Sequence, residues 1–165
     1  MQDVVRWVEA GTPADASGFH TVTRDGVATP LGDGVAFTTA DAQCVTNRYR
    51  DGALACLVNL VDPPPRPDDV EGMWKGNWVD FTGMTLEVGS AHGDPGPFGD
   101  GAGAALPVGS SLAFGDYRCR ADAADLLCVN YARQSAVRLA ADGVQPFGCL
   151  QDAGATPGIG RQYTC

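Results

Sequence analysis

Six cysteines constrain the fold of this 165-residue chain more than any other feature of its sequence. Six cysteines allow many connectivities, and we predict nearest-neighbour pairing because each close pair brackets a turn signal. Zinc-binding spacings, such as cysteines separated by two residues, do not occur. Disulfides persist in oxidising compartments, so the sequence predicts an extracytoplasmic location, either secreted or anchored on the outer side of the cytoplasmic membrane. The predicted bridges are Cys44 with Cys56, Cys119 with Cys128, and Cys149 with Cys165.

Residues 112–139 have the pattern of a three-strand meander around the second cysteine pair. Apolar and aromatic residues lead into Cys119, the polar segment 120–125 reverses the chain, and residues 126–129 return beside the first run. Cys119 and Cys128 would then lie opposite each other, with Cβ atoms about 4.5–5.5 Å apart, which a disulfide can bridge after small adjustment. Other apolar runs are separated by strong two-residue turn signals, which predict short antiparallel strands. These signals are Asp25-Gly26, Asp33-Gly34 and Asp51-Gly52.

The first cysteine pair conflicts with the turn signal that it encloses. Symmetric pairing about Asp51-Gly52 would place Cys56 opposite Asn47 instead of Cys44. The bridge therefore requires a bulge or a longer loop in this hairpin.

Prolines in residues 63–67 prevent this segment from joining a sheet, because they lack the backbone N–H donor. We predict that it connects two disulfide-bridged hairpin halves, roughly residues 19–62 and 72–150, followed by a tail at 151–165. At the N-terminus, residues 3–10 predict a short helix that begins at an Asp3 cap, ends before Gly11 and docks on the sheet through Trp7. The expected fold is one extracytoplasmic domain, 1–165, mainly β, forming a small antiparallel sheet or sandwich.

The charge of the chain excludes some partners. Twenty acidic and 11 basic residues give a net charge of −9, which repels phosphate backbones and anionic lipid head groups. We therefore expect no nucleic-acid partner. No apolar run reaches the roughly 18 residues of a membrane span, so direct membrane insertion by this segment is not expected either. The composition, with Lys75 as its single lysine, is typical of a GC-rich genome such as that of an actinobacterium.

The chain resembles a family of secreted or lipoprotein-like actinobacterial domains of unknown function that contain cysteine hairpins. The resemblance covers roughly residues 35–150 and departs from the family pattern at residues 38–43, where the usual Ser-Pro-Ser-Gly-Asn-Ile lead is absent. It implies an envelope location and a β-rich fold, and it brings no catalytic residues. The matching positions are residues 37–44, Cys56, Leu106-Pro107-Val108-Gly109, Gly115-Asp116, Cys119 and Cys128-Val129-Asn130.

Trp74, Trp78 and Phe81 are the first candidates for a binding site. On one strand, Trp74 and Trp78 would point to the same face with Gly76 between them, forming a platform for a sugar ring or a partner's apolar side chain. The alternative is that these aromatic residues belong to the core, which we favour because side chains of this size are usually buried.

The long loop 89–103 supplies two further candidates, His92 and Asp94. Ser90, His92 and Asp94 are the residue types of a hydrolase triad, but triad side chains converge from separate segments, so we assign no catalytic residue. Calcium-binding loops place carboxylates at short, regular spacings around a glycine, and this loop does not. We therefore expect neither a metal nor a cofactor.

The favoured function is a non-catalytic cell-envelope domain for protein binding or sensing, the soluble part of an anchored or secreted protein. One alternative is a module that binds cell-wall glycan through Trp74 and Trp78. A second alternative is a hydrolase centred on His92. Homodimerisation through an exposed apolar edge or patch is a further possibility.

Overall fold

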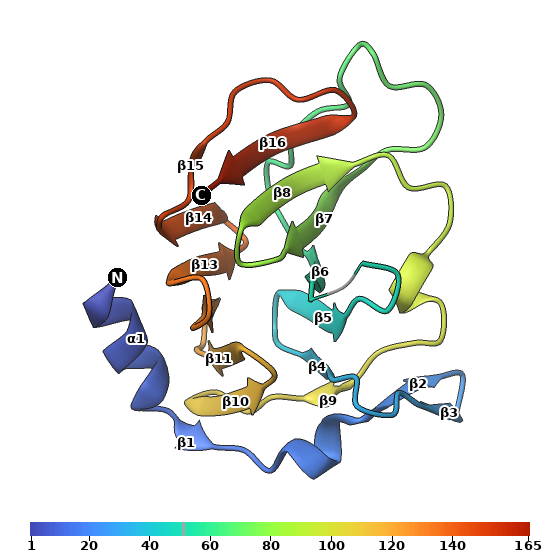
Figure 1. Cartoon of the computed structure of the whole chain (residues 1–165). Coiled ribbons are helices and arrows are strands. Elements are labelled where there is room, and N and C mark those ends of the chain that lie inside the picture. Colours follow the sequence, from blue (N-terminus) through green and yellow to red (C-terminus); the bar gives the residue numbers. More distant parts are fainter. Residues whose placement is uncertain (51) are drawn as a thin grey trace.

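The computed structural model describes residues 1–50 and 52–165, and it is mainly β as predicted (Figure 1). Two large sheets face each other. The six-stranded sheet has the order β1 (Thr12–Pro13), β10 (Ser110–Phe114), β11 (Tyr117–Ala121), β12 (Asp125–Asn130), β13 (Ser135–Ala140) and β14 (Gly143–Gly148). The eight-stranded sheet has the order β15 (Gln151–Asp152), β16 (Ile159–Thr164), β8 (Thr85–Ser90), β7 (Lys75–Phe81), β6 (Leu54–Val58), β5 (Ala42–Thr46), β4 (Ala36–Thr38) and β9 (Ala104–Ala105).

The main core lies between these sheets. Alternate residues of each strand point inward, so both sheets contribute apolar side chains to the same cluster. Phe37, Leu54 and Phe81 come from the eight-stranded sheet, while Leu112 and Leu139 come from the six-stranded sheet. All five side chains are at most 1% exposed.

The predicted disulfide pairing is confirmed. Cys44 lies directly opposite Cys56 on β5 and β6, and Cys119 lies directly opposite Cys128 on β11 and β12. These two bridges belong to opposite sheets and are buried in the core that the sheets share. The predicted meander is confirmed as β10 to β13, paired in sequence order.

The first cysteine hairpin has a longer loop than the turn signal indicates. Thr46 pairs with Leu54, so residues 47–53 form the connection and Cys44 can face Cys56. The backbone N–H of Asn47 donates to the carbonyl of Ala53 across the base of this loop. Of the predicted turn dipeptide, Asp51 lies outside the described residues.

The third disulfide joins the two sheets at one edge of the sandwich. Cys149 follows β14 and Cys165 follows β16, and both residues are exposed. The segment predicted as a tail is therefore part of the fold, because β16 pairs with β8 along most of its length.

The two sheets do not correspond to the two predicted hairpin halves, because strands from both halves pair in the eight-stranded sheet. Residues 63–67 contain no strand, as predicted, but β7 and β8 follow this connector and still pair beside β6. The later strands β10 to β14 form the opposite sheet. The connector is thus a long loop between β6 and β7, which are antiparallel neighbours in the same sheet.

Each sheet also has a covered outer face. Helix α1 (Gln2–Glu9) places Val8 against Val129 and Ala136 of the six-stranded sheet, and the Arg120 guanidinium lies 4.0 Å from the ring centre of Trp7. The predicted Asp3 cap is wrong, because the N-cap is Met1, two residues earlier, and Asp3 lies in the first turn of the helix. The helices in the described part of the chain are too short and too polar to span a bilayer.

The outer face of the eight-stranded sheet is covered by a hairpin and by a loop segment. One is the hairpin of β2 (Thr21–Arg24) and β3 (Val27–Pro30), which follows a short helix, η1 (Ala16–Phe19). The other is segment 91–103, which contains the short helix η2 (Gly96–Phe98). Thr23 and Ala102 exchange backbone hydrogen bonds between them, and Val22 and Phe98 form an outer cluster with Trp78. This cover places part of segment 91–103 beside the loop 47–53.

Candidate binding site

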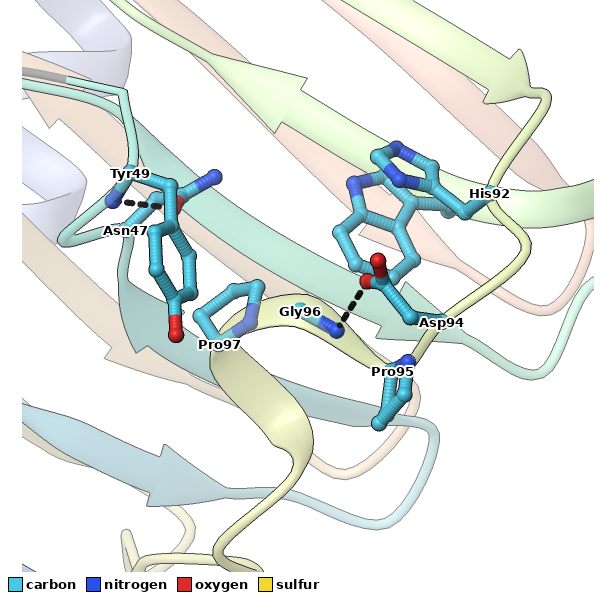
Figure 2. A pocket seen from close by; sticks show the side chains of 8 residues that line it. Asn47, Tyr49, His92, Asp94, Pro95, Gly96 and Pro97 are labelled. Carbon is cyan, nitrogen blue, oxygen red and sulfur yellow. Dashed lines mark hydrogen bonds between the residues drawn. The ribbon is translucent and has the colours of Figure 1, made fainter.

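A pocket of about 510 Å³ opens where these two loops meet (Figure 2). Asn47 and Tyr49 form one side, and His92 forms the other. Trp78 also lines the pocket, stacked against His92. Asp94 and residues 95–97 line the pocket between these sides. We call this site the aromatic pocket. Its volume lies within the range of roughly 300–1,000 Å³ that is typical of small-molecule sites.

One wall is a stack of two rings. The His92 imidazole lies nearly parallel to the Trp78 indole, with 3.7 Å between ring centres and an angle of 18°. Phe98 meets the same indole edge-on at 4.9 Å. Trp78 is only 1% exposed because it is covered in this way, so His92 presents the outer surface of the wall.

The indole of Trp78 is held by a buried carboxylate. Trp78 Nε1 donates to Asp80 Oδ2 at 3.1 Å, and Asp80 is 5% exposed. Burial raises the pKa of Asp80, while the nearby Arg50 charge and the Trp78 hydrogen bond oppose that rise. The other carboxylate oxygen, Oδ1, has no hydrogen-bond partner among the described residues.

The wall that contains Tyr49 also contacts β7 and β8, through Arg50. Glu87 on β8 lies directly opposite Asp80 on β7, and both face Arg50 from the loop 47–53. Arg50 Nη1 is 2.8 Å from Glu87 Oε2 and 3.7 Å from Asp80 Oδ2. Because Tyr49 precedes Arg50 in the chain, this contact holds the loop that carries Tyr49.

Tyr49 is the exposed aromatic residue of the pocket. The residue is 68% exposed, and its hydroxyl accepts a hydrogen bond from Arg48 at 2.8 Å. Asn47 Oδ1 accepts the backbone N–H of Tyr49 at 2.9 Å, an Asx turn that fixes the start of the loop. The Asn47 amide nitrogen points away from this hydrogen bond (Figure 2).

The predicted residues of the 89–103 loop both reach the pocket, but they do not form a triad. Burial lowers the pKa of His92, which keeps the imidazole neutral at neutral pH. Asp94 Oδ1 accepts from the Gly96 N–H at 2.9 Å, and Lys75 Nζ donates to the Asp94 backbone carbonyl at 3.0 Å. Within the described ranges, the His92 ring makes no hydrogen bond to Ser90, to Asp94 or to any other residue.

The structure favours the core interpretation over an exposed platform of Trp74 and Trp78, because Trp78 is 1% exposed and packs with Phe98 of the long loop. A register shift between Lys75 and Val79 interrupts the pairing of β7 with β8, and the strand begins after Trp74. Trp74 is half-buried over Gly89 and donates to the Pro64 carbonyl at 2.9 Å. Phe81 lies in the core between the sheets, so the core interpretation is correct for Phe81.

Tyr49 and Asn47 are the site residues that sequence reasoning missed. The available signal was a tyrosine within a polar turn, where burial is not expected. In the part of the chain that the structure describes, no three His, Cys, Asp or Glu side chains converge to hold a metal ion.

Comparisons with models of protein families, with curated proteins and with solved structures find no match for this chain. The resemblance to actinobacterial cysteine-hairpin domains therefore stays a prediction.

Proposed function

We propose that this chain is a non-catalytic extracytoplasmic domain of the cell envelope, secreted or anchored, that binds another envelope molecule in the aromatic pocket. The observation that carries the proposal is the exposed ring of Tyr49 across the pocket from the His92 and Trp78 stack. Exposed aromatic residues at a concave site are typical binding hot spots, because they offer large contact area at low cost in conformational entropy.

Three disulfides support the extracytoplasmic part of the proposal, since such bonds persist in oxidising compartments. The two buried bridges hold the strands that form the sandwich, and the pocket lies on the outer face of one of its sheets. A rigid scaffold with a site on its loops is a common arrangement in binding domains.

A hydrolase centred on His92 has less support. General-base catalysis requires a histidine within hydrogen-bond reach of the group that it deprotonates, and a third group usually orients the ring. His92 has neither contact among the described residues, and its ring is stacked on Trp78 instead.

Retention on isolated cell walls tests the proposal. The purified domain would be mixed with insoluble walls of an actinobacterium and sedimented, and the bound fraction would be measured for the native chain and for Tyr49→Ala. Val108→Ala is the control, because Val108 is 65% exposed and lies outside the pocket lining. We expect Tyr49→Ala to lose retention while the control keeps it. Equal retention of all three proteins, or no retention of any, would contradict the proposal.

A further inference from the structure

We propose that the ligand of the aromatic pocket is a neutral sugar unit of an envelope glycan, held against Tyr49 and His92 through the apolar face of its ring. This inference rests on the proposed function and deepens it by naming the ligand class.

The arrangement of apolar and polar groups in the pocket fits a sugar ring. A pyranose has C–H bonds on its flat faces and hydroxyl groups around its edge, so it needs apolar walls and polar groups at the rim. Tyr49 and the stacked His92 supply the walls, on two sides of the pocket (Figure 2). The low pKa of His92 keeps this wall uncharged at neutral pH.

The rim offers both a donor and an acceptor. Asn47 uses its Oδ1 to accept the Tyr49 N–H, which leaves its amide nitrogen as a donor. Asp94 uses Oδ1 to accept the Gly96 N–H, which leaves its second carboxylate oxygen as an acceptor. Sugar hydroxyls donate and accept at once, so one ring can satisfy both groups.

The floor of the pocket is preorganised. Gly96 stands between Pro95 and Pro97 with a φ of 53°, and a Cβ added there would lie 3.1 Å from the Trp78 ring. Proline fixes φ on both sides, while glycine permits the close approach to Trp78. A floor that is already ordered reduces the entropy lost when a weakly held ligand such as a sugar binds.

A proline-rich peptide fits the pocket less well. Such peptides dock into aromatic grooves, and their backbone carbonyls accept hydrogen bonds from donors on the receptor. Here the Trp78 indole N–H is already donated to buried Asp80, 3.1 Å away, so a peptide carbonyl would have to use the Asn47 amide at the rim instead of an indole N–H. The His92 ring also covers the indole face on which a proline would stack.

The charge of the chain favours a neutral sugar over an acidic one. The net charge is −9, and Asp94 stands at the rim. Two cations lie near the pocket and both already have partners: Arg48 is 3.5 Å from Asp100, and Lys75 Nζ donates to the Asp94 carbonyl at 3.0 Å. Phosphate-bearing and uronic-acid glycans would therefore meet repulsion from Asp94 and from the net charge of the chain, with no unpartnered cation among the described residues of the lining to offset it.

The test is an NMR titration of the ¹⁵N-labelled chain. Its probes are neutral oligosaccharides of N-acetylglucosamine, glucose, galactose and arabinose, each added separately. Oligogalacturonate and an oligoproline peptide serve as comparison ligands. Amide shifts would be followed in the native chain, in Tyr49→Ala, in Tyr49→Phe and in the control Val108→Ala.

We expect at least one neutral oligosaccharide to give saturable shifts around residues 47–50 and 92–98. Tyr49→Ala should weaken this binding about tenfold or more, as removal of an aromatic hot spot does. Tyr49→Phe should bind within about threefold of the native chain, because the ring rather than the hydroxyl makes the contact. Val108→Ala should be unchanged.

The inference is overturned if no neutral oligosaccharide gives saturable shifts, if the shifts lie elsewhere, or if only the peptide or the acidic sugar binds the pocket. The wall-retention experiment separates such a failure from failure of the proposed function. Retention that depends on Tyr49, together with no sugar binding, would keep the binding domain and remove the sugar as its ligand.

Discussion

The three disulfides are expected to differ in their contribution to stability, in an order that loop length alone does not predict. Each bridge would be removed by replacing both cysteines with alanine. The bridges close segments with sequence separations of 12, 9 and 16 residues. Because loop-closure entropy grows only with the logarithm of loop length, these separations give about 2.8, 2.6 and 3.1 kcal/mol. By this account the exposed bridge, Cys149 with Cys165, contributes slightly more than the others.

Burial reverses this order. The sulfur atoms of the two inner bridges belong to residues that are at most 1% exposed within the main core, whereas Cys149 and Cys165 are exposed. Replacing a buried cysteine with alanine leaves a cavity, which costs about 1 kcal/mol for each group of methyl size. Loss of either inner bridge should therefore lower the free energy of unfolding by roughly 5 kcal/mol, and loss of the exposed bridge by roughly 3 kcal/mol.

Urea unfolding followed by circular dichroism, with tryptophan fluorescence as a second probe, would measure these free energies. An inner variant that does not fold agrees with the expectation, because 5 kcal/mol can equal the entire stability of a domain. A loss for the exposed bridge that equals or exceeds both inner losses would refute the reasoning. In that case the buried sulfurs would not act as packed core groups.

Three further outcomes follow from the structure. Dithiothreitol under native conditions should reduce Cys149 with Cys165 first, which alkylation and mass spectrometry would detect; equal rates for all bridges would contradict their burial. Burial raises the pKa of Asp80 above 3.8, so protonation of this carboxyl group stabilises the folded state. The stabilisation is complete below the unfolded pKa and is lost as pH rises through the folded pKa. The unfolding free energy of Asp80→Asn relative to the native chain should thus increase with pH across that interval, and a constant difference in urea titrations would argue against it. Gly148→Ala should strongly lower the free energy of unfolding, because an added Cβ would collide with the Gln134 carbonyl. Gly154 has nearly the same φ but open space around it, so Gly154→Ala should lower that free energy by only about 1–2 kcal/mol. Thermal unfolding would measure both changes.

Local signals in the sequence predicted the strands and the disulfides well. Cys119 and Cys128 bracket a polar reversal, and alternation on both sides of it fixes which face is buried. The run of β6 also carried a signal, since Leu54, Ala55, Cys56 and Val58 are apolar without alternation. Such a run indicates a strand that is buried on both faces. It is covered on its outer side by the cluster that contains Trp78.

Pairings between distant segments could not be predicted in the same way. β16 joins β8, and β9 lies parallel to β4, but nothing in the local sequence of either strand specifies these neighbours. The pocket depends on such a long-range event, because His92 reaches Trp78 only after segment 91–103 folds over the sheet. Tyr49 gave a weak signal, since a single exposed aromatic residue is common on protein surfaces.

The carboxylates under the aromatic pocket show how the sheet sets its geometry. Asp80 and Glu87 are buried or half-buried on a face whose other neighbours, such as Ala55 and Val45, are apolar. Burial of charged groups seldom adds net stability, because loss of hydration offsets their attraction to Arg50. Their contacts have a different consequence: Asp80 orients the indole of one wall, and both carboxylates hold the arginine that follows Tyr49 in the other wall. Asp80 and Glu87 pair directly across β7 and β8, so strand register places side by side the two carboxylates that contact Arg50. We therefore interpret this buried charge cluster as the link between the two walls of the pocket.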